Sequence, residues 1–536
     1  MQYDFLSYPY KSQRMSIYAK NGMVATSQPL AAQAGLEILK KGGNAIDAAI
    51  ATAACLTVVE PTSNGIGGDA FALVWSNDKL HGLNSSGCAP KAISVEAVKN
   101  RGHHKMPQHG WLPVTVPGTP GAWAALSERF GRLPFSELLK PAIMYASEGY
   151  PLSPILAKYW RKAVDELKGS FRGEEFKPWF DTFTINGEPP TAGQVWQSEA
   201  HARTLQLIAD TKVEAFYRGE LAEKIAAFSK KHGGFLDEED LAGYYPEWVE
   251  PIKINYRGYD VWEIPPNGHG LTTLMALNIV KGFDFSAKDC VDTYHKQIEA
   301  MKLAFTDGQH YITDARHMKA KVELLLAEEF ATQRRQLITD IALTPAPGTL
   351  PAGGTVYLAT ADNEGNMVSY IQSNYSDFGS GIVIPDTGIA LQNRGREFSL
   401  DPEHINVLLP GKKTYHTIIP GFLTKDNEPI GPFGVMGAYM QPQGHMQVVM
   451  NTIDFNLNPQ ASLDAPRWMW HTNKTVKVEP HFPDHLAQAL ARRGHDIVKS
   501  IDEDGFGRGQ IIWRDTKTGI LNGGTDPRTD GQIACW

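Results

Sequence analysis

The run of residues 344–354 is the feature that most constrains the fold of this 536-residue chain. It packs three prolines and three glycines into eleven residues, a composition typical of an exposed, irregular linker. Apolar and polar residues then alternate over 355–361 and over 366–373, on either side of an Asp-Asn-Glu-Gly turn. This pattern predicts a β-hairpin that begins directly where the linker ends.

The part of the chain before the linker is expected to be mixed α/β. A short strand over 23–26 precedes a helix that stops at Gly42-Gly43. Residues 44–58 form a second helix made almost wholly of small and apolar residues, which predicts burial on most of its sides. Residues 151–350 are mostly amphipathic helices, with a strand pair near 252–264.

The composition argues against several function classes. The chain has 51 Lys and Arg against 59 Asp and Glu, a net charge of −8, whereas nucleic-acid-binding domains are usually basic. The longest apolar stretch, 48–59, is too short to span a bilayer. Residues 1–20 contain no apolar signal-peptide core. We therefore expect a cytoplasmic protein without nucleic-acid or membrane partners.

The sequence contains no convincing metal or phosphate site. The four cysteines lie far apart, and His103, His104 and His109 lack a paired carboxylate and helical spacing. The glycine-rich loop 61–69 follows a helix and precedes a strand, the reverse of the order in a phosphate-binding loop, and no lysine follows it. We interpret this loop as a tight turn and expect neither a metal nor a cofactor.

Thr355 is the candidate nucleophile. If the peptide bond between Gly354 and Thr355 were cut, the threonine would gain a free α-amine with a pKa of about 7.7–8.0. Such an amine can accept the proton of the adjacent hydroxyl group and so activate it. Taken alone, however, a threonine at the start of a strand is more often an ordinary β-former.

Six segments, in order along the whole chain, resemble the gamma-glutamyltranspeptidase family. They are the block 23–69, Pro-Gly-Thr-Pro-Gly at 117–121, Gly354-Thr355, Gly-Ser-Gly-Ile at 379–382, Asn-Thr-Ile-Asp at 451–454 and Gly-Thr-Asp-Pro-Arg at 524–528. The resemblance implies an N-terminal-nucleophile hydrolase of the α/β (α+β) class, a four-layer αββα sandwich made as a self-cleaving precursor. A mostly helical large subunit, 1–354, and a β-rich small subunit, 355–536, would be intertwined in one domain.

The resemblance also implies the catalytic roles. Thr355 would be the nucleophile, both for self-cleavage after Gly354 and for catalysis, and Ser373 would hydrogen-bond to it. Gly437 and Ala438 lie where the family has a Gly-Gly pair whose backbone N–H groups form the oxyanion hole. An alanine keeps its N–H group, so the hole is retained.

The substrate side departs from the family pattern. Ser86 lies where the family has an arginine that binds the α-carboxylate of glutamate, and a serine cannot make that charged contact. Glu397 replaces the aspartate that binds the α-ammonium, and Arg394 and Arg396 beside it could bind a carboxylate instead. The other candidate substrate contacts are Tyr375, Asn393, His416 and Thr417. Plain structural roles stay open for three of these residues. Arg394 and Arg396 could be surface or ion-paired charges, and His416 could be a buried structural histidine.

The segment between Ser399 and His416 is shorter than the family's usual lid, so we expect an open pocket. This pattern resembles the lidless, acylase-like branch of the family, which includes cephalosporin acylases. The favoured interpretation is an autoprocessed amide hydrolase or acyltransferase that forms an acyl-Thr355 ester with a small amide substrate. The alternatives are a true γ-glutamyltransferase or glutathione hydrolase of glutathione metabolism, and a catalytically silent binding homologue.

The first prediction concerns self-cleavage. Purified protein should separate on a denaturing gel into fragments 1–354 and 355–536, the smaller beginning Thr-Val-Tyr. Thr355→Ala should stay uncut because alanine has no oxygen for the acyl shift, whereas Thr355→Ser should cut more slowly. A fully active protein that remains a single chain would contradict the interpretation.

Overall fold

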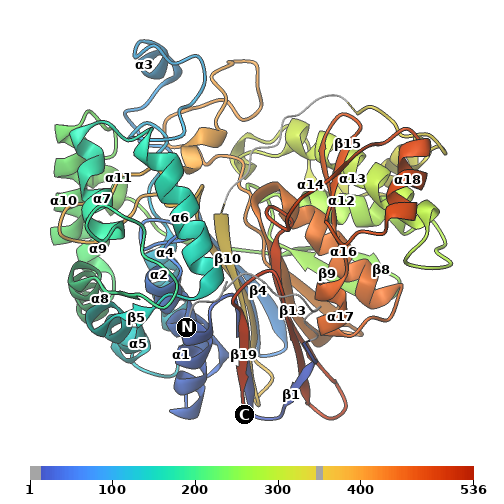
Figure 1. The fold of residues 1–536 in the computed structure, drawn as a ribbon, viewed down its shortest axis with the longest axis horizontal. Coiled ribbons are helices and arrows are strands. Elements are labelled where there is room, and N and C mark those ends of the chain that lie inside the picture. Colours follow the sequence, from blue (N-terminus) through green and yellow to red (C-terminus); the bar gives the residue numbers. More distant parts are fainter. Residues whose placement is uncertain (1–13, 346–353) are drawn as a thin grey trace.

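The structure, a computed structural model, describes residues 14–345 and 354–536. The predicted linker therefore lies almost entirely outside the described residues. Two seven-stranded sheets occupy the centre, and helices cover their outer faces (Figure 1). The predicted four-layer αββα sandwich is confirmed.

The sheet that carries Thr355 is called the β10 sheet. In spatial order it consists of β19 (Gln532–Cys535), β2 (Gly22–Thr26), β10 (Gly354–Asp362), β11 (Met367–Tyr375), β3 (Asp69–Ser76), β4 (Lys79–Ser85) and β7 (Glu247–Val249). Its outer face packs against α1 (Pro29–Lys40) and α2 (Ala45–Val59), with α4 (Thr119–Phe130) and α5 (Phe135–Glu148) beside α2.

The opposite sheet is called the β13 sheet. It consists of β1 (Ile17–Ala19), β18 (Leu521–Thr525), β17 (Arg508–Arg514), β13 (Glu428–Met436), β12 (Gly421–Lys425), β9 (Tyr259–Glu263) and β8 (Ile252–Tyr256). Helices α12 (Gly270–Val280) and α16 (Gln441–Ile453) pack against it, and α13 (Val291–Tyr311) packs against α12. A small sheet of β14 (Trp468–Thr472), β15 (Thr475–Val478) and β16 (Asp496–Lys499) lies apart.

Strands from both sides of the Gly354–Thr355 bond alternate in space. The β10 sheet combines β2, β3, β4 and β7 with β10, β11 and β19, and the β13 sheet is mixed in the same way. Two pieces cut at this bond would therefore share both sheets. The division into subunits stays a prediction.

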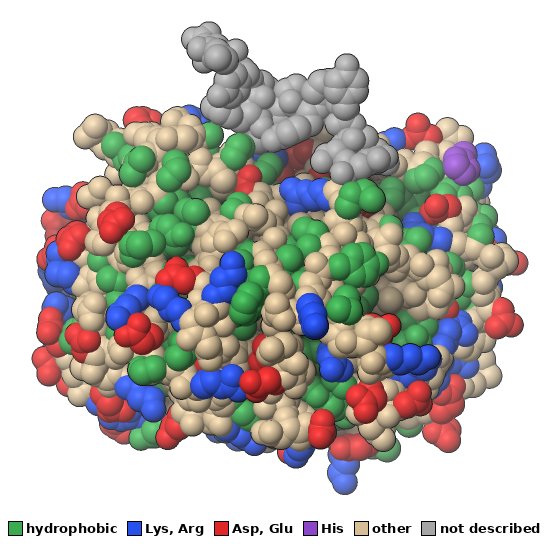
Figure 2. Space-filling view, turned by 90° about the horizontal axis from the view of Figure 1, so that it is seen from below, with side chains coloured by type: hydrophobic (Ala, Val, Ile, Leu, Met, Phe, Trp, Pro, Cys, Tyr) green, Lys and Arg blue, Asp and Glu red, His purple; other side chains and the backbone are tan. Residues whose placement is uncertain are grey.

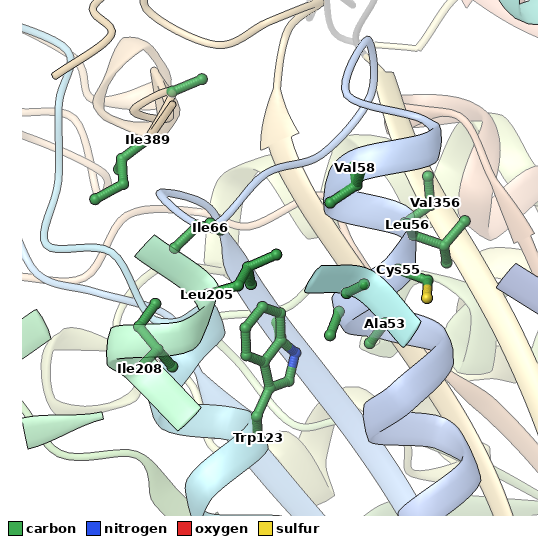
Figure 3. Packing of buried hydrophobic residues seen from close by; sticks show 14 of the residues in the cluster. Ala53, Cys55, Leu56, Val58, Ile66, Trp123, Leu205, Ile208, Val356 and Ile389 are labelled. Atoms are coloured by element: carbon green, nitrogen blue, oxygen red, sulfur yellow. The ribbon is translucent and has the colours of Figure 1, made fainter. Parts of the chain in front are cut away.

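Several elements predicted from the sequence are confirmed. Every residue of α2 is buried, and its N-cap Asn44 forms a capping box with Asp47. Figure 3 shows α2 residues Ala53, Cys55, Leu56 and Val58 close to Trp123 and Val356. Strands β10 and β11 form the predicted antiparallel hairpin, and the strand pair near 252–264 is present as β8 and β9.

Charged side chains of both signs are interspersed over the face drawn in Figure 2, in keeping with the mild net charge. Among residues 14–345 and 354–536, no helix is long and apolar enough to cross a membrane.

The side chains of β10 alternate between two environments. Tyr357, Ala359 and Ala361 belong to the core between the sheets, whereas Val356 and Leu358 belong to the core shared with α2. Because side chains on a strand repeat every second residue, Thr355 projects to the same side as Tyr357, toward the β13 sheet.

The two sheets approach each other closely at Gly434. A Cβ atom there would lie only 2.4 Å from the Tyr357 ring. Three residues earlier on β13, Gly431 lies against Met367, whose strand partner is Ala361. Strand β13 therefore crosses β10 in the opposite direction. The C-terminal end of β13, at Met436, is therefore directed toward the end of β10 that carries Thr355.

The close approach generates a stability prediction. Gly434→Ala should destabilise the fold by about 1–3 kcal/mol, because the added methyl group would overlap the buried Tyr357 ring. Gly169→Ala is the matched control, since a Cβ atom at Gly169 would meet nothing within 4 Å. Thermal unfolding should give a lower Tm for Gly434→Ala only, and equal Tm values would contradict the packing argument.

Candidate active site

The Thr355 side chain lies at the start of β10, facing the neighbouring strand β11. Its Oγ1 donates a hydrogen bond to Ser373 Oγ at 3.2 Å, and both residues are buried. Ser373 Oγ also accepts a hydrogen bond from the backbone N–H of Tyr375 at 2.8 Å. The Ser373 hydroxyl keeps a proton of its own, so it can also donate to Thr355. The two predicted hydroxyl groups are thus together.

Gly437 and Ala438 follow directly after β13, at the level where that strand reaches Thr355. Ala438 is the first residue of the 3-10 helix η4 (Ala438–Met440), which runs into α16. The first N–H groups of a helix have no partner within it, and they form its positive end. These backbone groups are suited to hold an oxyanion that develops on a carbonyl attacked by Thr355.

Asp69, the first residue of β3, is the strand partner of Ser373. Its Oδ2 lies 3.0 Å from His416 Nε2, and its Oδ1 accepts hydrogen bonds from Gln392 Nε2 at 2.9 Å and Gly87 N at 3.1 Å. Burial raises the pKa of Asp69 to about 7 and lowers the pKa of His416 well below its usual range. His416 is therefore a buried residue held by Asp69.

The glycine-rich loop that precedes Asp69 is a tight turn, as predicted, closed by a hydrogen bond from Gly68 N to Gly65 O at 3.1 Å. It packs directly on the site, since a Cβ atom at Gly68 would lie 2.6 Å from the carbonyl oxygen of Ser373. The loop therefore needs a residue without a side chain at this point.

Ser86 is fully buried in a network of amide side chains rather than facing a cavity. Its Oγ donates to Asn84 Oδ1 at 2.7 Å and accepts from Asn267 Nδ2 at 3.2 Å. Asn267 Nδ2 also donates to the carbonyl oxygen of Thr414 at 2.9 Å. Ser86 is thus surrounded by neutral groups that bond to one another.

Glu397 is held by two buried tyrosines. Tyr375 OH donates to one carboxylate oxygen, and Tyr439 OH donates to the other at 2.5 Å. Burial raises the pKa of both tyrosines well above the usual range, and the negative charge of Glu397 raises it further. Both hydroxyl groups therefore keep their protons.

The two arginines beside Glu397 have different surroundings. Arg394 is fully buried, its guanidinium lies over the Tyr375 ring at 4.3 Å, and its Nη1 donates to Thr417 Oγ1 at 2.6 Å. Arg396 is partly exposed and lines a cavity. The alternative of a surface charge is therefore wrong for Arg394.

That cavity has a volume of about 810 Å³ and lies beside Gly437. Its lining includes His109, Tyr159, Arg396, Tyr439, Met440 and Arg508. Burial and the positive charge of Arg396 lower the pKa of His109 to about 4, so this ring is neutral at pH 7.

Asn393 joins two loops instead of facing the cavity. Its Oδ1 accepts from Ser376 N at 3.1 Å, and its Nδ2 donates to the carbonyl oxygen of Gln108 at 2.8 Å. The structure thus uses the side chain to position the residues after β11.

The openness of the substrate pocket after cleavage stays a prediction. Thr355 is 1% exposed and Arg394 is 0% exposed. The short segment after Ser399 does not line the 810 Å³ cavity. Its Leu400 and Leu408 belong instead to a separate buried cluster with Ile93.

Sequence reasoning missed Asp69, Tyr439, Asn84 and Asn267. Asp69 lies at the end of a loop that was interpreted only as a turn. Its position at the start of a buried strand was the one sequence feature that could have marked it as a site residue. Tyr439 and Asn267 lie far in sequence from Glu397 and Ser86, and Asn84 lies two residues before Ser86, but no pattern in the chain marked any of the three.

A buried group of possible metal ligands, His295, Glu299 and His495, involves helix α13 and does not belong to this site. Lys302 Nζ lies 2.7 Å from Glu299 Oε1 and 3.3 Å from His495 Nδ1. The ammonium group already supplies a positive charge there.

Comparison with known proteins agrees with this geometry. The family model described as Gamma-glutamyltranspeptidase matches residues 31–536. The crystal structure of a cephalosporin acylase from Bacillus halodurans superposes with a TM-score of 0.98, at 66% identity, covering 100% of this chain and 99% of that one.

Two curated relatives are similar over nearly their whole length. The glutathione hydrolase-like YwrD proenzyme of Bacillus subtilis is 36% identical over 96% of this chain and 98% of its own. The oxamate amidohydrolase proenzyme of Klebsiella pneumoniae is 34% identical, with the same coverage of both chains. This chain therefore belongs to the gamma-glutamyltranspeptidase family and is an autoprocessing amide hydrolase of that family.

Proposed function

We propose that the protein, once cut before Thr355, hydrolyses amides of small carboxylic acids through an acyl-Thr355 ester. The observation that carries the proposal is the hydrogen bond between Thr355 and Ser373 at the start of β10. Strand β13, which Gly437 follows, runs toward the same end of β10. A nucleophile, a hydroxyl partner and backbone donors for an oxyanion are thereby within one small region.

Self-cleavage would begin when Thr355 Oγ1 attacks the carbonyl carbon of Gly354. The hydroxyl proton passes to the peptide nitrogen as the C–N bond breaks, which leaves an ester and a free α-amine on Thr355. Water then hydrolyses the ester, so the large chain ends in the carboxylate of Gly354.

Catalysis would repeat this chemistry on an external amide. The α-amine of Thr355 accepts the proton of Oγ1, which attacks the substrate carbonyl carbon. The N–H groups of Gly437 and Ala438 hold the oxyanion. The C–N bond breaks, the leaving amine takes the proton from the α-ammonium, and water, deprotonated by the same amine, releases the acid. An acceptor amine in place of water would give acyl transfer.

The acyl donor is proposed to be one without the α-amino group of glutamate. Ser86 supplies no charged contact, and the tyrosine hydroxyl groups already occupy both oxygens of Glu397. The names of the similar cephalosporin acylase and oxamate amidohydrolase support this choice.

Glutathione hydrolysis is the second candidate, because Glu397 keeps its acidic charge and a similar relative is named glutathione hydrolase-like. The cytoplasm remains the proposed compartment.

The substrate proposal predicts a preference between two anilides. Processed protein should hydrolyse glutaryl p-nitroanilide with a kcat/KM roughly tenfold to a hundredfold above that for γ-glutamyl p-nitroanilide, because the contact for the α-carboxylate is missing. Thr355→Ala should hydrolyse neither. A higher kcat/KM for γ-glutamyl p-nitroanilide or glutathione would favour the second candidate instead.

Ser373 should act through the nucleophile. Ser373→Ala removes the hydroxyl partner of Thr355, and we expect kcat to fall about tenfold to a hundredfold while KM changes little. Self-cleavage of freshly made protein should slow as well. Ser373→Thr keeps a hydroxyl group and should retain most of the activity. An unchanged kcat in Ser373→Ala, with the protein fully folded, would remove Ser373 from the proposed machinery.

A further inference from the structure

The carboxylate of Asp377 lies in the 810 Å³ cavity without a partner. Asp377 is the second residue after β11, and it lines the cavity together with Gly437. Within residues 14–345 and 354–536 its side chain forms no hydrogen bond, and no ion pair within 4.0 Å. Because a partly buried charge without a partner is costly, this carboxylate is suited to a ligand of opposite charge.

The backbone on both sides of Asp377 is fixed by packing. On one side, the N–H group of Ser376 donates to Asn393 Oδ1 at 3.1 Å. On the other side, Phe378 is fully buried, and the centre of its ring lies 4.6 Å from that of Phe183. The side chain of Asp377 is therefore held at the wall of the cavity before any ligand binds.

Two cations act on Asp377 from a distance, and both have other partners. Arg508 Nη1 lies 3.6 Å from a carboxylate oxygen of Glu60, and Lys162 Nζ lies 3.9 Å from Asp504 Oδ2. Burial raises the pKa of Asp377 to about 6, and the positive charges of Arg508 and Lys162 limit this rise. The carboxyl group is therefore mostly ionised at pH 7, and it is not neutralised by a cation of the chain.

The cavity extends from the proposed oxyanion donors to solvent. Its lining includes Gly437 and the buried Met440, and also Ile501, which is 98% exposed. During turnover the acyl group stays on Thr355, while the amine departs and water or an acceptor amine enters. The half of the amide that exchanges with solvent is thus the half suited to this cavity, whose volume is typical of a small-molecule site.

We propose that Asp377 binds a cationic group on the amine half of the amide, so that the preferred leaving amines, and the preferred acceptors, carry a second, protonated nitrogen. This inference rests on the proposed function, and it concerns the amine rather than the acyl group. An ammonium group donates up to three hydrogen bonds, and a carboxylate accepts such charge-assisted bonds strongly. A diamine acylated on one nitrogen is the simplest substrate of this class.

The test compares two glutaryl anilides whose leaving amines have nearly the same size. One releases 4-(aminomethyl)aniline, whose aminomethyl group is protonated at pH 7, and the other releases 4-(hydroxymethyl)aniline. Chromatography of the released anilines gives the charged-to-neutral ratio of kcat/KM values. In Asp377→Asn this ratio should be about tenfold lower than in the wild-type protein, whereas Asp377→Glu, which keeps the charge, should retain most of it. The intrinsic effect of the charge on the leaving group cancels in this comparison.

Glu166→Gln is the matched control, because Glu166 lines the same cavity but is exposed. It also removes one negative charge, and it should leave the charged-to-neutral ratio at the wild-type value. A ratio unchanged in Asp377→Asn would overturn the assignment, and so would an equal fall in Glu166→Gln. If the wild-type protein hydrolyses neither anilide, the proposed function fails, and binding of the amines then decides whether the cation site exists.

Binding of the free amines tests the site apart from catalysis and from variants that do not fold. In thermal unfolding of wild-type protein, millimolar 4-(aminomethyl)aniline should raise Tm by more than the same concentration of 4-(hydroxymethyl)aniline. The difference between the two amines should be absent from Asp377→Asn. Equal effects of both amines on the wild-type protein would contradict a cation site at Asp377.

Discussion

The site depends on the close contact between two sheets at Gly434 and Tyr357. The absence of a side chain on Gly434 lets the tyrosine ring of β10 lie against the backbone of β13. This contact fixes the register of the two crossing strands, and so brings the residues after β13 to the start of β10. A nucleophile from one sheet and backbone N–H groups from the other are joined by packing alone.

A buried polar network surrounds this point of contact. Asp69, His416 and Arg394 carry formal or potential charges in the interior, where each is costly to bury, and Glu397 beside them is half-buried. The chain offsets the cost with hydrogen bonds that Gln392 donates to Asp69, that Arg394 donates to Thr417 and that two tyrosines donate to Glu397. Such a network contributes little net stability, but it holds donors and charges in fixed positions before a substrate arrives.

Much of the fold followed from the sequence because it depends on local patterns. The small apolar residues of α2 could only be buried, and the alternation around the turn at 362–366 could only form a hairpin. Thr355 became a candidate because the Gly-rich segment ends directly before a strand, and the family resemblance then singled it out. These signals are local in the chain.

The contents of the site could not be predicted in the same way. Asp69 and His416 are 347 residues apart, and only the assembled sheets bring them to 3.0 Å. Arg394 and Arg396 are nearly identical in sequence context, yet one is buried over an aromatic ring and the other lines a cavity. Burial of polar side chains such as these depends on tertiary packing, which local sequence patterns do not determine.

The central claim is that the hydroxyl group of Thr355 carries the acyl group during turnover. The most direct measurement is mass spectrometry of processed protein, quenched in acid during steady-state hydrolysis of a glutaryl anilide and digested with protease. The account predicts one glutaryl ester, on the peptide that begins at Thr355, which disappears when the substrate is exhausted. Turnover with the acyl group on another residue, or without any acyl adduct under conditions where deacylation limits the rate, would contradict it.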